Sequence, residues 1–180
     1  AQESSEISDF WSMLQGFQTS GKCIEKAHYR IRYMKFFRPL SVKEDIEFKE
    51  ARPILYLNTA AVASLFSSRN AGSTSNRSNW STIMSYLKSH TSYLGLKQDR
   101  FTILLPSGLP DYTIDIVNGE QVKKVKVNRP KALCFDYLQL KETFGLDLET
   151  EVVAENQEEI PAESNVIDLQ QLKQNELPFE

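Results

Sequence analysis

The chain has 180 residues, of which 41% are hydrophobic and 11% aromatic, an ordinary composition for a globular protein with its own core. No apolar run reaches the roughly 18–20 residues of a membrane span, and the first residues lack the basic and apolar regions of a signal peptide, so a cytoplasmic protein is expected. The only two cysteines, Cys23 and Cys134, are expected to be buried free thiols, with one disulfide as the alternative.

The formal net charge of −3 combines two parts of opposite sign. Residues 1–146 carry 20 Lys and Arg against 14 Asp and Glu, whereas residues 147–180 carry ten acids and one base, Lys173. A basic body favours nucleic acid as a ligand, and an acidic tail favours a basic protein surface. We therefore expect one mildly basic domain over 1–146 and a disordered acidic tail over 147–180.

The first part of the body predicts one helix followed by strands. Apolar spacing predicts a helix over residues 8–20, with Ser8 as its N-cap and Gly21 as its stop. Alternation predicts a strand over 27–37 with one apolar face and one largely basic face. Residues 44–50 alternate weakly, and Pro53 introduces a short predicted strand at 54–57.

Two helices separated by a polar loop are predicted next. The first, over 59–67, is capped by Asn58 or Thr59, and the loop covers 67–79. The clearest helix of the chain follows over 79–89, where apolar residues have i, i+3, i+4, i+7 spacing: Trp80, Ile83, Met84 and Leu87.

The rest of the body is predicted to be rich in strands. They are expected at 100–105, 112–117, 121–127 and 132–135. Asn118-Gly119 between the second and third is the strongest short hairpin signal known. Asp136 is placed to cap a last helix.

The order helix, loop, helix and hairpin resembles a winged helix-turn-helix, in which the second helix enters the major groove and a hairpin wing touches the DNA backbone. We therefore predict an α+β fold that is winged-helix-like at its centre, with a β-hairpin wing, and DNA as the partner. The connection of roughly eleven residues is longer than the three or four of the motif, so an ordinary core helix behind a loop is the alternative.

Candidate nucleic-acid contacts come from the helix and from the hairpin. On the helix they are Arg77, Asn79, Thr82 and Lys88. On the hairpin and directly after it they are Lys123, Lys124, Lys126, Arg129 and Lys131. These five positive charges can neutralise several phosphates and give a salt-sensitive affinity that depends little on sequence. Lysines on an edge strand also prevent aggregation without any ligand, so both interpretations stay open.

The strand at 27–37 offers a second basic surface. Its basic side carries Arg30, Arg32, Lys35 and Arg38, with Tyr29 and Tyr33 nearby. Arginines beside stacking aromatics suit single-stranded nucleic acid. However, tyrosines at period two face away from the arginines, so core positions for them are the alternative.

No residue set in this chain specifies a reaction, and we expect no enzymatic activity, cofactor or metal. The two histidines, His28 and His90, lack the spacing of zinc ligands. Asp111 and Asp115 are four residues apart, which suits either a magnesium site or a solvated strand face.

The acidic tail ends in Leu177-Pro178-Phe179-Glu180. This ending resembles the C-terminal peptides of bacterial single-strand-binding proteins and of some replisome helicases, which combine diffuse negative charge with one aromatic anchor. The resemblance implies that Leu177, Pro178 and Phe179 enter a basic-rimmed pocket of a replication protein, although those peptides end on the Phe. A protein–protein interaction module that uses this tail is therefore the alternative to DNA binding.

Four segments of the body together resemble the C-terminal accessory region of primase–helicase proteins from phages and mobile elements of Bacteroides-type bacteria. They are Ile7-Ser-Asp-Phe-Trp, Trp80-Ser-Thr-Ile-Met-Ser-Tyr-Leu-Lys, Arg100-Phe and Cys134-Phe-Asp-Tyr. The resemblance covers roughly residues 7–146. It implies a DNA-contacting accessory domain that lies downstream of an ATPase motor in a replication protein, and this chain carries no motor motif of its own.

Overall fold

A computed structural model of the chain describes residues 2–69 and 79–151. All of the described helices and strands belong to one compact unit, Ala1–Thr150. The acidic tail from residue 152 onward lies outside the described residues, as do the predicted contacts Arg77, Leu177, Pro178 and Phe179. None of the helices in the described part is both long and apolar enough to cross a membrane.

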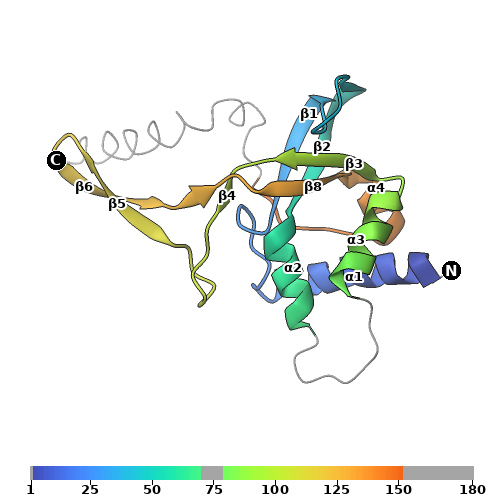
Figure 1. The fold of residues 1–180 in the computed structure, drawn as a ribbon, viewed down its shortest axis with the longest axis horizontal. Coiled ribbons are helices and arrows are strands. Elements are labelled where there is room, and N and C mark those ends of the chain that lie inside the picture. The colour runs from blue at the N-terminus through green and yellow to red at the C-terminus, as the bar shows by residue number, and fades with distance from the viewer. Residues whose placement is uncertain (1, 70–78, 152–180) are drawn as a thin grey trace. The chain divides into compact units, whose positions relative to one another are not determined.

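A four-stranded antiparallel sheet forms the centre of the unit (Figure 1). Its strands, in spatial order, are β1 (Tyr29–Phe37), β2 (Ile46–Asn58), β8 (Lys131–Asp136) and β3 (Tyr93–Gln98). β2 is one long strand that covers most of the weakly alternating segment at 44–50 and all of the short strand at 54–57, which the sequence predicts separately. Pro53 is tolerated inside β2 because β8 pairs only with residues 54–58, so the missing N–H removes no bond to β8.

Four helices accompany this sheet in the described residues: α1 (Gln2–Thr19), α2 (Thr59–Ser68), α3 (Trp80–Ser89) and α4 (Tyr137–Phe144). The prediction that Ser8 caps α1 is wrong, because the helix already begins at Gln2 and Ser8 lies inside it. The predicted caps Asn58 and Asp136 are confirmed, and Asn79, which was not predicted as a cap, caps α3. The side chains of Asn58, Asn79 and Asp136 each accept the N–H three residues later, which satisfies one free donor at each helix start.

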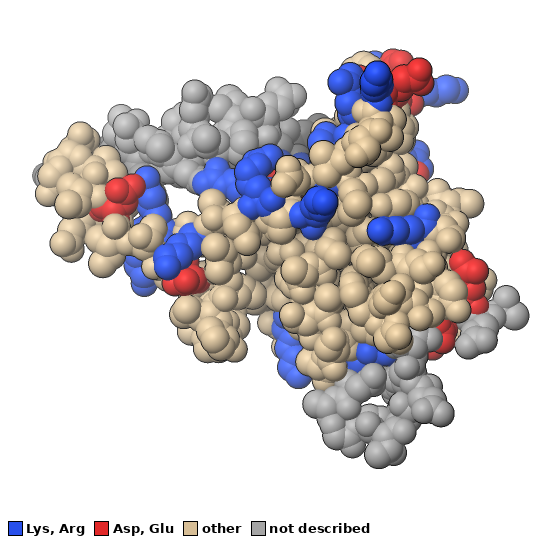
Figure 2. All heavy atoms as spheres, viewed as in Figure 1, with Lys and Arg blue, Asp and Glu red and all other residues tan. Residues whose placement is uncertain are grey.

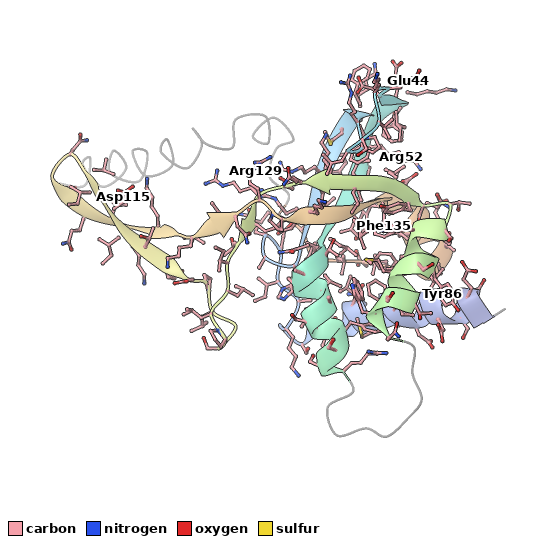
Figure 3. The ribbon with its side chains drawn as sticks, in the orientation of Figure 1. Glu44, Arg52, Tyr86, Asp115, Arg129 and Phe135 are labelled. Atoms are coloured by element: carbon pink, nitrogen blue, oxygen red, sulfur yellow. The ribbon has the colours of Figure 1, made fainter. Side chains whose placement is uncertain are left out.

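The main core lies between the helices and one face of the sheet. The helices contribute Phe10, Trp11 and Leu14 from α1, Val62 and Phe66 from α2, Ile83 and Leu87 from α3, and Leu140 from α4, all buried. Opposite them the strands contribute Tyr29, Ile31, Leu55, Leu57, Leu133 and Phe135. Phe135, labelled in Figure 3, meets the Trp11 ring edge-on at 5.1 Å between ring centres. The predicted apolar face of α3 is therefore the buried face. On the predicted apolar face of β1, Tyr29 and Ile31 are buried and Tyr33 is exposed.

A smaller cluster covers the other face of the sheet. It consists of Phe37, Ile54, Tyr56, Phe101, Ala132 and Cys134. Cys134 and Cys23 are both buried and free, which confirms the prediction of two buried thiols. Burial raises the pKa of the Cys23 thiol to about 12.

The connection from β3 to β8 carries a separate hairpin. β4 (Phe101–Thr102) pairs with β7 (Val127–Asn128) next to the sheet, so the predicted strand at 100–105 is reduced to two residues. Beyond this pair, β5 (Tyr112–Val117) and β6 (Glu120–Val125) form the hairpin that we call the arm (Figure 1). Asn118 and Gly119 both have positive φ, +53° and +80°, as the two-residue turn of this hairpin requires.

The packed chain continues past the point where the charge changes sign. Leu146 and Leu148 are both buried in the main core. The Tyr137 hydroxyl accepts the N–H of Leu148 at 2.8 Å, and the Tyr29 hydroxyl donates to the carbonyl of Glu149. A truncation that leaves this core intact therefore has to keep residues through about 151.

Candidate nucleic-acid interface

α3 has one buried face and one exposed polar face. Ile83 and Leu87 enter the core, while the exposed positions are Asn79, Ser81, Ser85, Lys88 and Ser89. The helix has a basic residue in its last turn and no acidic residue in its first. This face can donate and accept hydrogen bonds, but it carries only one positive charge.

The predicted α3 contacts differ in how available they are. The Asn79 amide oxygen accepts the Thr82 N–H at 2.9 Å, so Asn79 holds the helix start and part of its hydrogen-bonding capacity is used. Thr82 is half-buried and Lys88 is exposed. Of the three described residues of this set, Lys88 is the one most accessible to a ligand.

The arm places its lysines on two faces. β5 and β6 pair so that Ile114 lies opposite Lys123 and Thr113 opposite Lys124. Because side chains alternate along a strand, Lys123 shares a face with Tyr112, whereas Lys124 shares the other face with Asp115. The basic run in the sequence is therefore not one continuous patch.

Each lysine of the arm has a neighbour within the arm or beside it. The Lys123 ammonium lies 4.1 Å from the centre of the Tyr112 ring, a cation–π distance. Lys124 pairs with Asp115 at 3.0 Å and Lys126 with Asp111 at 3.4 Å. Hydrogen bonding to Lys124 lowers the pKa of the Asp115 carboxyl, which keeps it ionised. The aspartates that the sequence offers as a magnesium pair are thus partners of the lysines, and they reduce the net positive charge of the arm.

The base of the arm holds the remaining predicted cations. Arg129 and Lys131 are exposed, and Figure 3 places Arg129 where the arm joins the sheet. In Figure 2, Lys and Arg side chains extend along the arm and onto the neighbouring surface, with acidic side chains among those of the arm. Among the described residues, no hydrogen bond or ion pair joins the α3 set to the arm set. The predicted contacts thus form two separate groups.

The arginines of β1 and of the residue after it form hydrogen bonds and ion pairs within the fold. Arg30 donates through Nη1 to the carbonyl of Arg100 at 2.8 Å, and Arg32 makes a buried ion pair with Asp99. Arg38 pairs with Asp45 at 2.8 Å on the surface. Tyr29 is fully buried, as its core interpretation predicts, whereas Tyr33 is 45% exposed. Of the second basic surface considered from the sequence, Arg30 and Arg32 are therefore bound into the fold, whereas Tyr33, Lys35 and Arg38 are exposed.

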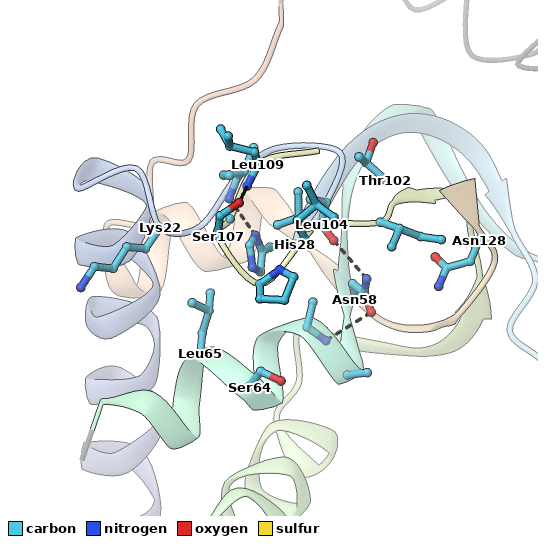
Figure 4. Close-up of a pocket in the computed structure, with 18 of the residues that line it drawn as sticks. Lys22, His28, Asn58, Ser64, Leu65, Thr102, Leu104, Ser107, Leu109 and Asn128 are labelled. Carbon is cyan, nitrogen blue, oxygen red and sulfur yellow. Dashed lines mark hydrogen bonds between the residues drawn. The ribbon is translucent and has the colours of Figure 1, made fainter. Parts of the chain in front are cut away.

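A cavity of about 910 Å³ lies between α2, the segment around residues 21–28 and the loop at 102–109 (Figure 4). Two of its polar side chains bond to backbone. Asn58 donates to the Ala27 carbonyl at 3.0 Å and accepts the Ala61 N–H, and His28 Nδ1 accepts the Ile24 N–H at 3.0 Å. These bonds shape the wall of the cavity, and the other polar side chains of its lining are Lys22, Ser64, Thr102, Ser107 and Asn128.

The search for a metal site covers residues 2–69 and 79–151. No three His, Cys, Asp or Glu side chains gather closely enough there to hold a metal ion. Burial lowers the pKa of His28, and His90 Nδ1 lies 2.7 Å from the hydroxyl of Ser92. Both histidines therefore bond locally within the fold.

Two features of the arm are not among the contacts that the sequence predicts. The first is the apolar row Tyr112, Ile114 and Ile116, which is exposed on one face of β5. The second is the anchoring of the arm's base by Asp99. The alternating residues of β5 could have predicted the apolar row, but alternation alone does not say whether an apolar face packs against a core.

Comparisons with protein-family models, with curated proteins and with solved structures return no match for this chain.

Proposed function

We propose that residues 2–151 bind DNA as a winged-helix-like accessory domain of a replication or mobile-element protein, with α3 as the reading helix and the arm as the wing. The observation that carries this proposal is the order of elements. β2 precedes the helix pair α2 and α3, β3 and β8 follow it, and the arm lies between these two strands. β8 lies between β2 and β3 in the sheet, which brings the strand before the helix pair and the strands after it into one unit.

The connection between the two helices is the main departure from a helix-turn-helix. It spans eleven residues, 69–79, where the motif has three or four. Both helices nevertheless contribute to the same core and Phe66 of α2 contacts the Trp80 ring of α3 at 5.5 Å between centres. Their packing thus supports a helix pair despite the longer connection.

The charges support a phosphate-binding role for the arm. Asp115, the partner of Lys124, is exposed, whereas Asp111, the partner of Lys126, is half-buried. Ion pairs at the surface are weak, so a phosphate can replace the Asp115 carboxylate at small cost. Lys88 and the serines of α3 suit contacts with base edges or phosphates. The expected binding is weak in sequence preference and strongly dependent on salt.

The proposal is tested by fluorescence anisotropy with a labelled DNA duplex and the full chain at two salt concentrations. Replacing Lys123, Lys124 and Lys126 with Ala should weaken binding at low salt by about tenfold or more and reduce the slope of log K against log salt by about 2–3. The matched control replaces Lys22, Lys43 and Lys49, three exposed lysines outside every surface considered as a nucleic-acid contact, and should change the affinity less than twofold.

Two results would contradict the proposal. One is the absence of binding to any duplex at low salt. The other is an equal loss of affinity in the arm variant and in its control, because that result would reflect net charge alone. A single-stranded probe of the same length distinguishes duplex binding from single-strand binding.

A further inference from the structure

The arm exposes a row of large apolar side chains that nothing in the described residues covers. On β5, Tyr112, Ile114 and Ile116 are 43%, 68% and 70% exposed, and all three lie on one face. An isolated two-stranded hairpin is marginally stable in water, and exposed apolar rows of this kind mark interaction sites. The same face carries Lys123, whose ammonium lies 4.1 Å from the centre of the Tyr112 ring, and the inference from the apolar row does not rest on the proposed DNA binding.

The backbone of β5 is also open at its outer edge. Lys126 donates its N–H to the carbonyl of Asp111, just before the paired strands begin. In an antiparallel pair, alternate residues direct both backbone groups to the partner strand. The Asp111 carbonyl accepts the Lys126 N–H, while the Asp111 N–H bonds to the carbonyl of Ile103. Within β5, the odd-numbered residues Thr113, Asp115 and Val117 therefore bond to β6, and Tyr112, Ile114 and Ile116 turn their N–H and C=O groups outward.

One local contact agrees with this assignment. The N–H of Ile116 is accepted by the side-chain oxygen Oδ1 of Asp115 at 3.0 Å, so it does not take part in the ladder with β6. The outward groups of Tyr112 and Ile114 form the rest of the edge. β5 thus presents an apolar row and a set of backbone donors and acceptors along the same strand.

We propose that this edge pairs with the same edge of a second copy of the chain, antiparallel and about a two-fold axis at Ile114. In that register Ile114 faces Ile114 of the second copy, and Tyr112 faces Ile116 of the second copy. The two hairpins then form one four-stranded sheet, in which the outward groups of Tyr112 and Ile114 and the C=O of Ile116 gain partners. The N–H of Ile116 exchanges the Asp115 side chain for the second copy.

The charges of the two edges favour a second copy at β5. In the proposed register Thr113 faces Asp115 of the second copy, and no like charges lie directly opposite each other. The same operation on β6 about Lys123 places two lysines face to face, which is destabilising. Lysines commonly protect an edge strand from pairing with another chain in this way. The β6 edge is therefore protected against pairing, and the β5 edge is available for it.

The experiment measures the association of the full chain by sedimentation equilibrium up to concentrations of about 100 µM. The test variant is Ile114→Pro, which removes an outward N–H and leaves the bonds to β6 intact. Its matched control is Lys123→Pro, at the residue directly opposite on β6. We expect a dimer in the wild-type chain and in Lys123→Pro, and an association constant at least tenfold lower in Ile114→Pro.

Two charge variants, which introduce no proline, test whether the two-fold axis lies at Ile114. Ile114→Lys and Ile114→Glu should each be monomeric, because like charges meet at the axis, and an equimolar mixture should form a heterodimer. The proposal is overturned by a wild-type chain that stays monomeric, by a dimer that survives Ile114→Pro, or by a mixture of the charge variants that stays monomeric. Circular dichroism of each variant confirms that it is folded.

Discussion

Arg32 on β1 and Asp99 directly after β3 form a buried ion pair through two hydrogen bonds. Nε of Arg32 lies 2.7 Å from Oδ2 of Asp99, and Nη2 lies 2.9 Å from Oδ1. Their side chains are only 11% and 9% exposed. Asp99 also accepts the N–H of Arg100 at 2.7 Å, so this pair anchors the point where the chain leaves the sheet toward the arm.

Removing one member of this pair should destabilise the fold strongly. Asp99→Ala leaves the guanidinium of Arg32 buried without this carboxylate, and the free energy of unfolding should fall by about 3–5 kcal/mol. Asp45→Ala, which breaks the exposed pair with Arg38, should cost no more than about 1 kcal/mol. Urea denaturation of both variants measures the difference. Equal losses would mean that burial does not set the strength of the Arg32–Asp99 pair.

Two glycines should respond in opposite directions to replacement by alanine. Gly95 has φ +133° at the irregularity in β3, and an added Cβ would lie 2.6 Å from the Cβ of Pro39. Gly95→Ala should therefore lower the free energy of unfolding by about 2–3 kcal/mol. Gly16 lies inside α1 with open space around it, so Gly16→Ala should raise it by up to about 1 kcal/mol. Thermal or urea unfolding checks both signs, and a tolerated Gly95→Ala would contradict the close approach of Pro39.

His28 should make the protein less stable as the pH falls. Burial lowers its pKa in the folded state below the unfolded value of about 6.5, so below that pH the unfolded chain binds a proton that the folded chain does not. The contribution of neutral, buried His28 to the free energy of unfolding is therefore present above pH 6.5 and is lost as the pH falls below it. His28→Asn keeps an acceptor for the Ile24 N–H and removes the titration, so it should lose less stability between pH 7 and pH 5 than the wild type. The midpoints of urea unfolding at several pH values compare the two proteins. If the midpoints of wild type and His28→Asn fall in parallel between pH 7 and pH 5, the prediction for His28 is wrong.

Removing residues 152–180 should strengthen DNA binding. These residues carry seven acids and one base, so the formal charge changes from −3 to +3 without loss of the described core. Anisotropy titrations at two salt concentrations should show a higher affinity for the truncated chain, most clearly at low salt. If the acidic tail is instead a partner-binding element, truncation should leave DNA binding unchanged and abolish capture of a replication protein with a basic pocket. Phe179→Ala in the full chain then tests the predicted anchor separately.

Local signals predicted most of the individual elements. The apolar spacing of α3, the caps Asn58 and Asp136 and the turn Asn118-Gly119 all depend on residues that are close in sequence, and all are confirmed. β3 was not predicted, because Tyr93-Leu-Gly-Leu has no clear alternation and becomes a strand only by pairing with β8. The start of α1 was placed too late, because residues 2–6 are all polar, although the apolar stripe of the helix already begins at the buried Ile7.

The candidate site shows the same division between local and distant information. The sequence by itself determined which residues are positively charged, where the hairpin turns and which face of α3 is apolar, since these follow from side-chain chemistry and spacing. The tertiary structure alone decided that Arg32 pairs with Asp99, 67 residues away, and that Lys123 and Lys124 point to opposite faces with separate partners. It also decided that the apolar face of β1 enters the core while that of β5 stays exposed. The physical reason is that alternation defines a face, and only the packing of distant elements determines whether that face is covered.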